Sequence, residues 1–555
     1  MKLVCLDWQT GFFLYTGFQH PRKPTAMDSK QFLITRITVI VALGGFLMGF
    51  DASVISGVVR FIEPQFGLSK LELGWAVGSL TLTATLGMLF AGPLSDRFGR
   101  RAILKTAAIL FGVSAIASAL APTFFILVLA RMIGGLGVGA SLIVAPMFIA
   151  EISPPKMRGK MVSVNQLNIV IGISTAFFTN YLILRWGQSD AAWAQALMFN
   201  EYNWRWMLGL ETLPAIIYFI GLMFVPQSPR WQIMAGRIDE ARVTMNKLYG
   251  EQEAEKQIQD VVNSLEKDKE KNKVSVRELF QPALRLVLII GVSLAILQQI
   301  TGINAVFFYA PMIFEQSGIG TDASFMQAIL VGLTNLVFTI LAIMFIDRLG
   351  RKPLLLFGMT GIAVMMILLA YGFHSATYQL TPESIDTLDE TIDRVALADN
   401  MGGITYPNDL LFKQALAETI GHEAAVEHES AIITAAIDMN PTLILLGILG
   451  FVASFAISIG PVMWVMFSEL FPLRVRGIAI SFAGFINSGV SFLVQLVFPW
   501  ELATIGNSMT FLIYGLFAIA GLIFVWRIVP ETKNKSLEEL EELLVRKRPD
   551  NLPSG

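Results

Sequence analysis

The hexapeptide Asp96-Arg97-Phe98-Gly99-Arg100-Arg101 recurs later in the chain as Asp347-Arg348-Leu349-Gly350-Arg351-Lys352. Each copy directly follows an apolar stretch of about 20 residues, the length that crosses a bilayer as a helix. A charged motif that returns behind a second apolar stretch indicates an internal duplication of the chain.

Two further motif pairs follow in the same order. In both copies a glutamate and an arginine stand seven residues apart where one apolar stretch ends and the next begins: Glu151 and Arg158, then Glu469 and Arg476. Val225-Pro226-Gln227-Ser228 closes the first copy, and Val529-Pro530-Glu531-Thr532 closes the second. The sequence therefore predicts a duplicated unit with one large insertion, at 375–440, in the second copy.

The composition is that of a chain whose surroundings are largely lipid. Of the 555 residues, 54% are hydrophobic and only 15% are charged, against roughly 25% charged in soluble domains. Backbone in lipid must satisfy its own hydrogen bonds, which favours helices. We therefore expect an all-α integral membrane protein with twelve transmembrane helices in two six-helix halves. The predicted spans are 33–58, 73–93, 103–121, 124–149, 160–183, 205–225, 285–311, 325–346, 353–373, 441–467, 476–499 and 505–529.

The spans and the hydrophilic stretches between them divide the chain into five parts. Lysine and arginine gather in one alternate set of connections, and basic connections stay in the cytoplasm. Both termini are therefore expected on the cytoplasmic side of the cell's plasma or inner membrane, and the acidic loop 375–440 on the outside. The parts are an N-terminal tail at 1–32, where Met27 offers an alternative start, a six-helix half at 33–228, a cytoplasmic helical linker at 229–283, a six-helix half at 284–530, and a cytoplasmic C-terminal tail at 531–555.

The composition also excludes several kinds of site. Cys5 is the only cysteine, so the chain has neither a disulfide framework nor a cysteine-based metal site. All four histidines lie outside the apolar spans. His422, Glu423 and His428 could be drawn as a metal site in the acidic loop, but a solvated helical cap is the favoured interpretation. A net charge of -2 gives no reason to expect a nucleic-acid partner.

Two ionisable residues lie deep in apolar spans, Asp51 in the first and Arg131 in the fourth. Such residues are costly in a membrane and usually functional. A buried carboxylate that faces an arginine is ionised while it is paired, and it can take up a proton when the arginine leaves. We expect this pair to act as a proton switch, with a fixed structural pair as the alternative.

Uncharged polar residues gather in several spans, mostly in the second half, together with one tryptophan. Amide side chains both donate and accept hydrogen bonds, as a hydroxyl-rich ligand requires, and an indole face packs against the C–H surface of a sugar ring. Hydrogen bonding between helices is the alternative role. The candidate residues are Gln166, Gln298, Gln299, Asn304, Asn335, Trp464 and Asn487.

The charged motifs at the span ends have a physical role beyond topology. Opposite charges at helix ends can pair with one another and with helix termini. We expect an inner latch between the halves that breaks when the cytoplasmic side opens, with simple anchoring of the loops as the alternative. The latch residues are Asp96, Arg97, Arg101, Glu151, Arg158, Asp347, Arg348, Arg351, Glu469 and Arg476.

Together these motifs resemble the sugar porter family of the major facilitator superfamily, in particular its bacterial proton-linked xylose symporters. The resemblance covers residues 33–545. It implies a central sugar site made by the seven residues above, a proton-linked role for Asp51 with Arg131, and an outer-gate role for Tyr309. Several residues differ from those common in the family, which leaves the particular sugar open and weakens one inner ionic contact: Met48, Phe50, Phe308, Ser488 and Gln227.

We therefore expect a secondary active transporter that carries a monosaccharide, a pentose or hexose such as xylose or glucose, in symport with protons by alternating access. No cofactor is expected besides the coupling proton, and no motif indicates an enzyme. The expected partners are the sugar and the lipid bilayer, with the monomer as the functional unit. A passive uniporter of a sugar or an inositol-like polyol, and a non-transporting membrane sugar sensor, are the alternatives.

Overall fold

The computed structural model describes residues 26–154, 157–270, 275–472, 474–535 and 537–544. These residues contain twelve helical segments that are long and apolar enough to cross a membrane, which confirms the predicted fold class. Residues 1–25 of the predicted N-terminal tail lie outside the described residues. The first helix begins at Ala26, within the stretch 1–32 that was predicted as the tail. The nine unbroken spans are α1 (Ala26–Phe66), α2 (Lys70–Phe98), α3 (Arg100–Ala119), α4 (Phe124–Ile152), α5 (Arg158–Gly187), α14 (Thr321–Leu349), α15 (Arg351–His374), α23 (Arg476–Thr504) and α24 (Gly506–Arg527).

The other three spans are each broken into two helices, which the apolar pattern did not predict. The break before α13 rests on Gly302, whose φ of +89° is in the left-handed region that favours glycine. A Cβ at this position would also lie 2.5 Å from the ring of Tyr514. Broken helices persist in membranes where the freed backbone is buried in protein or lines a polar cavity. The broken spans are α7 (Asn203–Gly209) with α8 (Thr212–Met223), α12 (Arg285–Ile300) with α13 (Ile303–Glu315), and α21 (Pro441–Ile457) with α22 (Ile459–Leu470).

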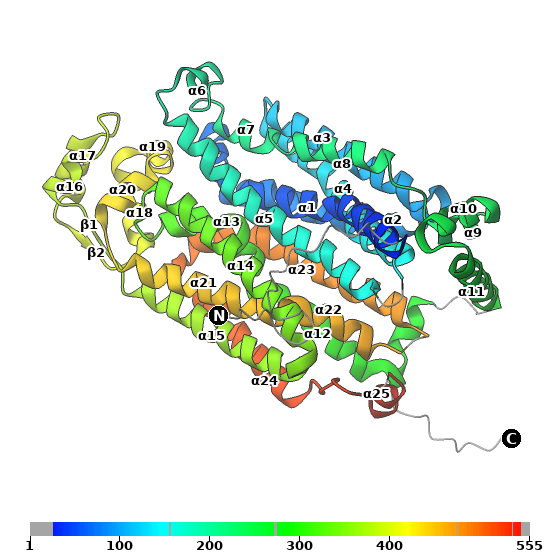
Figure 1. Ribbon diagram of the computed structural model, residues 1–555. Coiled ribbons are helices and arrows are strands. Elements are labelled where there is room, and N and C mark those ends of the chain that lie inside the picture. Colours follow the sequence, from blue (N-terminus) through cyan, green and yellow to red (C-terminus); the bar gives the residue numbers. More distant parts are fainter. Residues whose placement is uncertain (1–25, 155–156, 271–274, 473, 536, 545–555) are drawn as a thin grey trace, which may run out of the picture.

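The two halves pack side by side along the length of the helices (Figure 1). In the first half α1 packs on α5 and α2 on α4, and in the second half α15 packs on α24 and α21. Across the boundary α2 meets α23 and α5 meets α14. One large cluster of buried apolar side chains spans this boundary, and a second lies within the first half. Polar side chains at the boundary are therefore shielded from lipid by helices of both halves.

The loop predicted at 375–440 is a small folded unit, here called the insert. Its helices agree with the predicted helical cap, but it also contains a three-stranded antiparallel sheet in the order β2-β1-β3, which was not predicted. The unit has an apolar core of its own, centred on side chains such as Tyr378, Phe412 and Leu416. Its elements are β1 (Thr377–Gln379), α16 (Pro382–Asp386), α17 (Arg394–Met401), β2 (Thr405–Tyr406), α18 (Asp409–Ile420), α19 (His422–Glu427), α20 (Glu429–Ala436) and β3 (Ile437–Asp438).

The insert and the short α6 (Ala192–Ala196) lie at one end of the helix bundle, here called the outer end (Figure 1). The helices of the predicted linker lie at the opposite, inner end, and α25 (Leu537–Leu544) lies beside α22 there. The linker elements are α9 (Pro229–Met234), α10 (Ile238–Tyr249), α11 (Glu251–Glu270), η1 (Val276–Phe280) and η2 (Pro282–Leu284).

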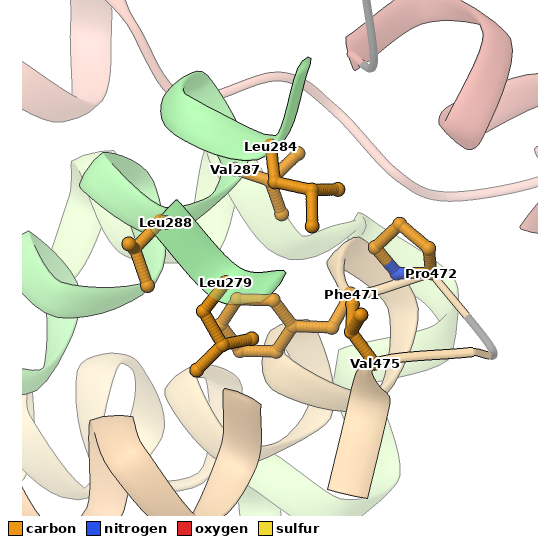
Figure 2. A pocket seen from close by; sticks show the side chains of 7 residues that line it. All are labelled: Leu279, Leu284, Val287, Leu288, Phe471, Pro472 and Val475. Atoms are coloured by element: carbon orange, nitrogen blue, oxygen red, sulfur yellow. The ribbon is translucent and has the colours of Figure 1, made fainter. Parts of the chain in front are cut away.

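The linker joins the second half through an apolar corner. Figure 2 shows Leu279, Leu284 and Val287 around a hollow that Phe471 and Pro472 close from the other side. The cavity measures about 10 Å³, roughly the room of one water molecule. Its lining is apolar, so it is a packing gap and not a site for a polar guest.

Candidate functional site

Asp51 on α1 and Arg131 on α4 lie together inside the first half, and each is only 1% exposed. Arg131 Nη1 is 3.4 Å from Asp51 Oδ1, and Arg131 Nε donates to the backbone oxygen of Ala76 on α2 at 3.0 Å. Asp51 Oδ2 and Arg131 Nη2 have no hydrogen-bond partner among the described residues. The structure therefore brings the predicted pair together, while each group keeps one polar atom unused.

Glu211, which the sequence analysis did not single out, belongs to the same charged site. It lies at the break between α7 and α8, is 1% exposed, and is close enough to interact electrostatically with both Asp51 and Arg131. Its Oε1 atom has no hydrogen-bond partner within the described part of the chain. One guanidinium and two carboxyl groups thus share one buried charged site. An acidic residue inside an apolar span was the signal that could have revealed it.

Gly134 on α4 allows the close packing around this site. A Cβ built on Gly134 would lie 2.7 Å from Asp51 Oδ2 and 2.5 Å from the hydroxyl of Ser114. Neither distance is compatible with ordinary van der Waals contact, so an added methyl group must displace α4 or the carboxylate. The glycine is therefore a packing requirement of the charged site.

We expect Gly134→Ala to destabilise the protein by about 1–3 kcal/mol, the usual cost of an extra methyl group in a packed interior. Thermal unfolding of the purified protein in detergent measures the change. Gly112→Ala is the matched control, because its Cβ would meet only the methyl group of Ala215, at 3.8 Å. Equal unfolding temperatures for the two variants would show that α4 accommodates the added methyl group without loss of stability.

Four of the predicted amides form one hydrogen-bonded cluster in the second half. Asn487 Nδ2 on α23 donates to Gln298 Oε1 on α12 at 2.7 Å, and Gln299 Nε2 donates to Asn487 Oδ1 at 3.2 Å. Asn304 Nδ2 at the start of α13 donates to Gln299 Oε1 at 2.9 Å and to the hydroxyl of Ser491 at 2.6 Å. The break between α12 and α13 lets Gln299 and Asn304 face the same point on α23.

The cluster continues into the first half through Gln495, another residue that no motif revealed. Gln495 is fully buried. Its Nε2 donates to Ser491 Oγ at 2.8 Å, and its Oε1 accepts a hydrogen bond from the hydroxyl of Thr81 on α2 at 2.9 Å. Its backbone oxygen accepts from the hydroxyl of Tyr309, the predicted gate residue, at 2.9 Å. The amides and the gate residue therefore belong to one network that crosses between the halves.

Three predicted sugar-contacting residues lie apart from this network. Gln166 is exposed, and Trp464 is 45% exposed with its ring packed edge to face on Phe467. Asn335 is buried, and it accepts a long hydrogen bond of 3.5 Å from Thr339. The structure thus places Gln166, Asn335 and Trp464 on the helices where they were expected, without joining them to the cluster.

The charged motifs form an equivalent arrangement at the inner end of each half. In the first half Arg100 pairs with Glu151 at 3.0 Å and with Asp96 at 2.8 Å, and Ser228 donates to Glu151. The amide oxygen of Gln227 accepts from the backbone N–H of Arg101 at the start of α3. The proline-containing motif therefore closes onto the charged motif.

The second half repeats these contacts position by position. Arg351 pairs with Glu469 at 2.8 Å and with Asp347 at 3.0 Å, and Thr532 donates to Glu469 at 2.5 Å. Glu531 accepts from the backbone N–H groups of Arg351 and Lys352 at the start of α15. Its bond to Lys352 corresponds to the bond of Gln227 to Arg101. The duplication read from the sequence is therefore also a duplication of contacts.

The inner contacts differ from the predicted latch in two ways. Arg100, which the prediction left out, makes the ion pairs of the first half, while Arg97 lies over the ring of Phe98 and Arg101 donates to backbone oxygens. Arg158 and Arg476 also donate to backbone oxygens. All inner-end pairs among the described residues lie within one half or join the linker to the second half, so none connects the first half to the second here.

Ion pairs that do connect the halves lie at the outer end. Arg60 on α1 pairs with Glu315 on α13, and Arg185 on α5 pairs with Asp322 on α14 at 3.1 Å. Tyr309 is fully buried between these contacts and the amide cluster. The structure is therefore closed at its outer end.

Comparisons with known proteins agree with this arrangement. A family model described as Sugar (and other) transporter matches residues 37–385 and 425–544. The arabinose-proton symporter of Bacillus subtilis (strain 168) is 34% identical over 526 residues, which cover 95% of this chain and 98% of that protein. The D-xylose-proton symporter of Escherichia coli (strain K12) is 34% identical over 543 residues, with 92% and 95% covered.

A solved structure supports the same comparison at the level of the fold. The inward open conformation of the xylose transporter XylE from E. coli superposes with a TM-score of 0.70 at 32% identity, covering 92% of this chain and 100% of that one. Closure of the outer end, seen here in the ion pairs between the halves, is consistent with this likeness.

Proposed function

Since this chain belongs to the Sugar (and other) transporter family, we propose that it carries a monosaccharide across the membrane in symport with a proton. It is a multi-pass membrane transporter and not an enzyme. The names of two relatives combine a pentose with a proton. One observation carries the proposal: the first half holds a buried carboxylate paired with a guanidinium, and the second half holds a cluster of neutral amides.

The amide cluster suits a hydroxyl-rich guest. Each amide group offers two donors and an acceptor, so it can bind a hydroxyl group in either role. Gln298, Gln299, Asn304 and Asn487 now satisfy one another, and a sugar that entered would exchange those bonds for bonds to its own hydroxyls. Gln166 and Trp464 are exposed, which leaves them available to contact the same guest. A pentose or a hexose satisfies this chemistry.

The charged site supplies the proton step. Asp51, Arg131 and Glu211 are buried together, so the charge balance of the site depends on whether a proton is bound. With Asp51 ionised, the guanidinium holds α1 and α4 together; with Asp51 protonated, that attraction weakens and the helices are free to move. Proton binding can thereby bias the equilibrium between conformations.

Alternating access connects the two sites. In the structure the halves are joined at the outer end through Arg60–Glu315 and Arg185–Asp322, and the inner ion pairs stay within the halves. An outward-open form would separate the outer contacts and close the inner end. The basic residues of the inner connections support an orientation with both termini in the cytoplasm and the insert outside.

Uptake into vesicles that contain the purified protein tests the proposal. With a proton gradient and a membrane potential imposed, we expect accumulation of xylose, arabinose or glucose above the external concentration. Without an imposed gradient, adding the transported sugar should make the external medium more alkaline. Sugar flux without proton movement would identify a passive uniporter, and no flux with any of the three sugars would overturn the proposal.

A further inference from the structure

The insert is fixed to the second half by polar contacts from one face of α18. Asp409 and Lys413 are four residues apart, so they lie on the same side of the helix. Asp409 Oδ2 accepts from Asn507 at the start of α24, from the backbone N–H at 3.2 Å and from the side chain at 2.8 Å. Lys413 Nζ donates to Gln316 Oε1 at 2.7 Å. Gln316 directly follows α13, so the insert holds the outer end of the broken span.

Glu429, the first residue of α20, extends this contact toward the first half. Its Oε1 accepts from Gln316 Nε2 at 2.8 Å and pairs with Lys413 at 2.9 Å. Its Oε2 lies 4.0 Å from the ammonium of Lys70 at the start of α2. Lys70 is also paired with Glu63 on α1, and α19 of the insert lies against α1. The insert therefore touches both halves at the end where they meet (Figure 1).

We propose that Glu429 is an outer-gate residue: the insert positions its carboxylate so that, by pairing with Lys70, it holds the two halves together when the outer end is closed. Arg60–Glu315 makes a second connection nearby, and both must separate before the outer end opens. Glu429 acts on transport by positioning the halves and touches no sugar. The inference rests on the proposed alternating access.

The charges needed for this gate are present over the whole physiological pH range. Burial raises the pKa of the Glu429 carboxyl, but Lys413 and Lys70 outweigh burial and bring the pKa down to about 2 from an ordinary 4.5. A lowered pKa means that the stabilisation is complete above the ordinary value and is lost as the pH falls through the lowered one. Among the charged groups around Glu429 are Lys413, Lys70, Glu63 and Glu315. The charges of the gate therefore stay the same over this pH range, and the gate is separate from the proton step at Asp51.

The family model does not match the anchoring part of the insert. The family model matches the chain up to residue 385 and again from 425, and it passes over the segment that contains Asp409 and Lys413. Glu429 itself lies in the matched part. The unmatched segment holds Asp409 and Lys413, which fix the insert in the position from which Glu429 lies near Lys70.

Distances between spin labels across the outer end test the gate. The full chain is used with Cys5 replaced by serine, and labels are placed at the exposed positions Ala196→Cys on α6 and Ser375→Cys after α15. We expect Glu429→Gln and Lys70→Gln each to raise the ratio of outer-open to outer-closed molecules about two- to fivefold, the effect of a partly exposed ion pair. The double variant should exceed the larger single effect only slightly, because both changes remove the same contact.

Glu423→Gln is the matched control. It removes one negative charge from the same insert at an exposed position on α19, and its distance distribution should equal that of the parent protein. Equal effects of Glu423→Gln and Glu429→Gln, or additive effects of the two gate substitutions, would overturn the gate.

Sugar uptake by the parent protein, measured in vesicles that contain it, tests the proposed function separately. Uptake together with unchanged distances in Glu429→Gln would overturn the gate and leave the function standing. Absence of uptake by the parent protein would overturn the proposed function, whatever the distances show.

Discussion

Asp51→Asn is expected to abolish accumulation of sugar against a gradient while sparing exchange of sugar across the membrane. Asparagine has nearly the shape of aspartate and can still accept a hydrogen bond from Arg131, so the space between α1 and α4 stays filled as in the protonated form. It cannot bind and release a proton, so uptake loses its link to the proton gradient. Counterflow with labelled sugar measures exchange, and uptake under an imposed proton gradient measures coupling.

A matched substitution shows whether the effect belongs to the site or to any lost ion pair. Asp322 on α14 pairs with Arg185 at 3.1 Å, and both side chains are about half exposed, 41% and 54%. Asp322→Asn makes the same chemical change at the outer end and should leave accumulation within about twofold, since exposed pairs contribute little. Undiminished accumulation in Asp51→Asn would remove the carboxyl from the coupling step.

The number of spans could be predicted from the sequence because each one is a long apolar run. In lipid the backbone of such a run must satisfy its own hydrogen bonds, which a helix does. The breaks within three of them could not. Gly302 between two apolar helices permits a left-handed residue but does not require one, and only the packing of Tyr514 against it shows why the span breaks there. Local pattern fixes which segments cross the membrane, whereas tertiary contacts fix where a span bends.

The charged and polar sites were predictable to the extent that their residues stand out in apolar surroundings. Asp51 and Arg131 did, and they lie together. Glu211 carried the same signal inside the predicted span 205–225, and the sequence analysis did not single it out. Gln495 carried a weaker signal, since its role depends on Thr81 and Tyr309 approaching it from other helices.

The inner charges show what a repeat can and cannot reveal. Equivalent positions in the two halves were recognised, but which arginine of Arg97, Arg100 and Arg101 faces Glu151 depends on helix rotation. Arg100 begins α3 and is 4% exposed, while the other two point to the ring of Phe98 and to backbone oxygens. The repeat identifies the contact, and only the three-dimensional arrangement identifies the donor.

Asn487→Leu is expected to raise the KM for sugar about 10- to 100-fold. Leucine has a similar volume but makes no hydrogen bonds. It would remove the bonds of Asn487 to Gln298 Oε1 at 2.7 Å and to Gln299 Nε2 at 3.2 Å, which keep only their bond to each other. It would also leave the sugar hydroxyl that Asn487 binds without a partner. A buried polar group without a partner costs about 1–3 kcal/mol, and each 1.4 kcal/mol is tenfold in affinity. Initial rates over a range of sugar concentrations give KM and kcat separately.

The same substitution at Asn335 on α14 provides the comparison that gives this result its meaning. Asn335 is as buried as Asn487, at 6% exposure for each, but it lies outside the cluster and has only the 3.5 Å hydrogen bond from Thr339. If the guest binds where the amides converge, Asn335→Leu should change KM by less than about threefold, because only a weak neutral hydrogen bond is lost. Comparable increases in KM for both variants would instead show that the sugar site extends to α14 and that Asn335 contacts the sugar. A fall in kcat at constant KM in Asn487→Leu would assign the cluster to movement of the halves rather than to binding.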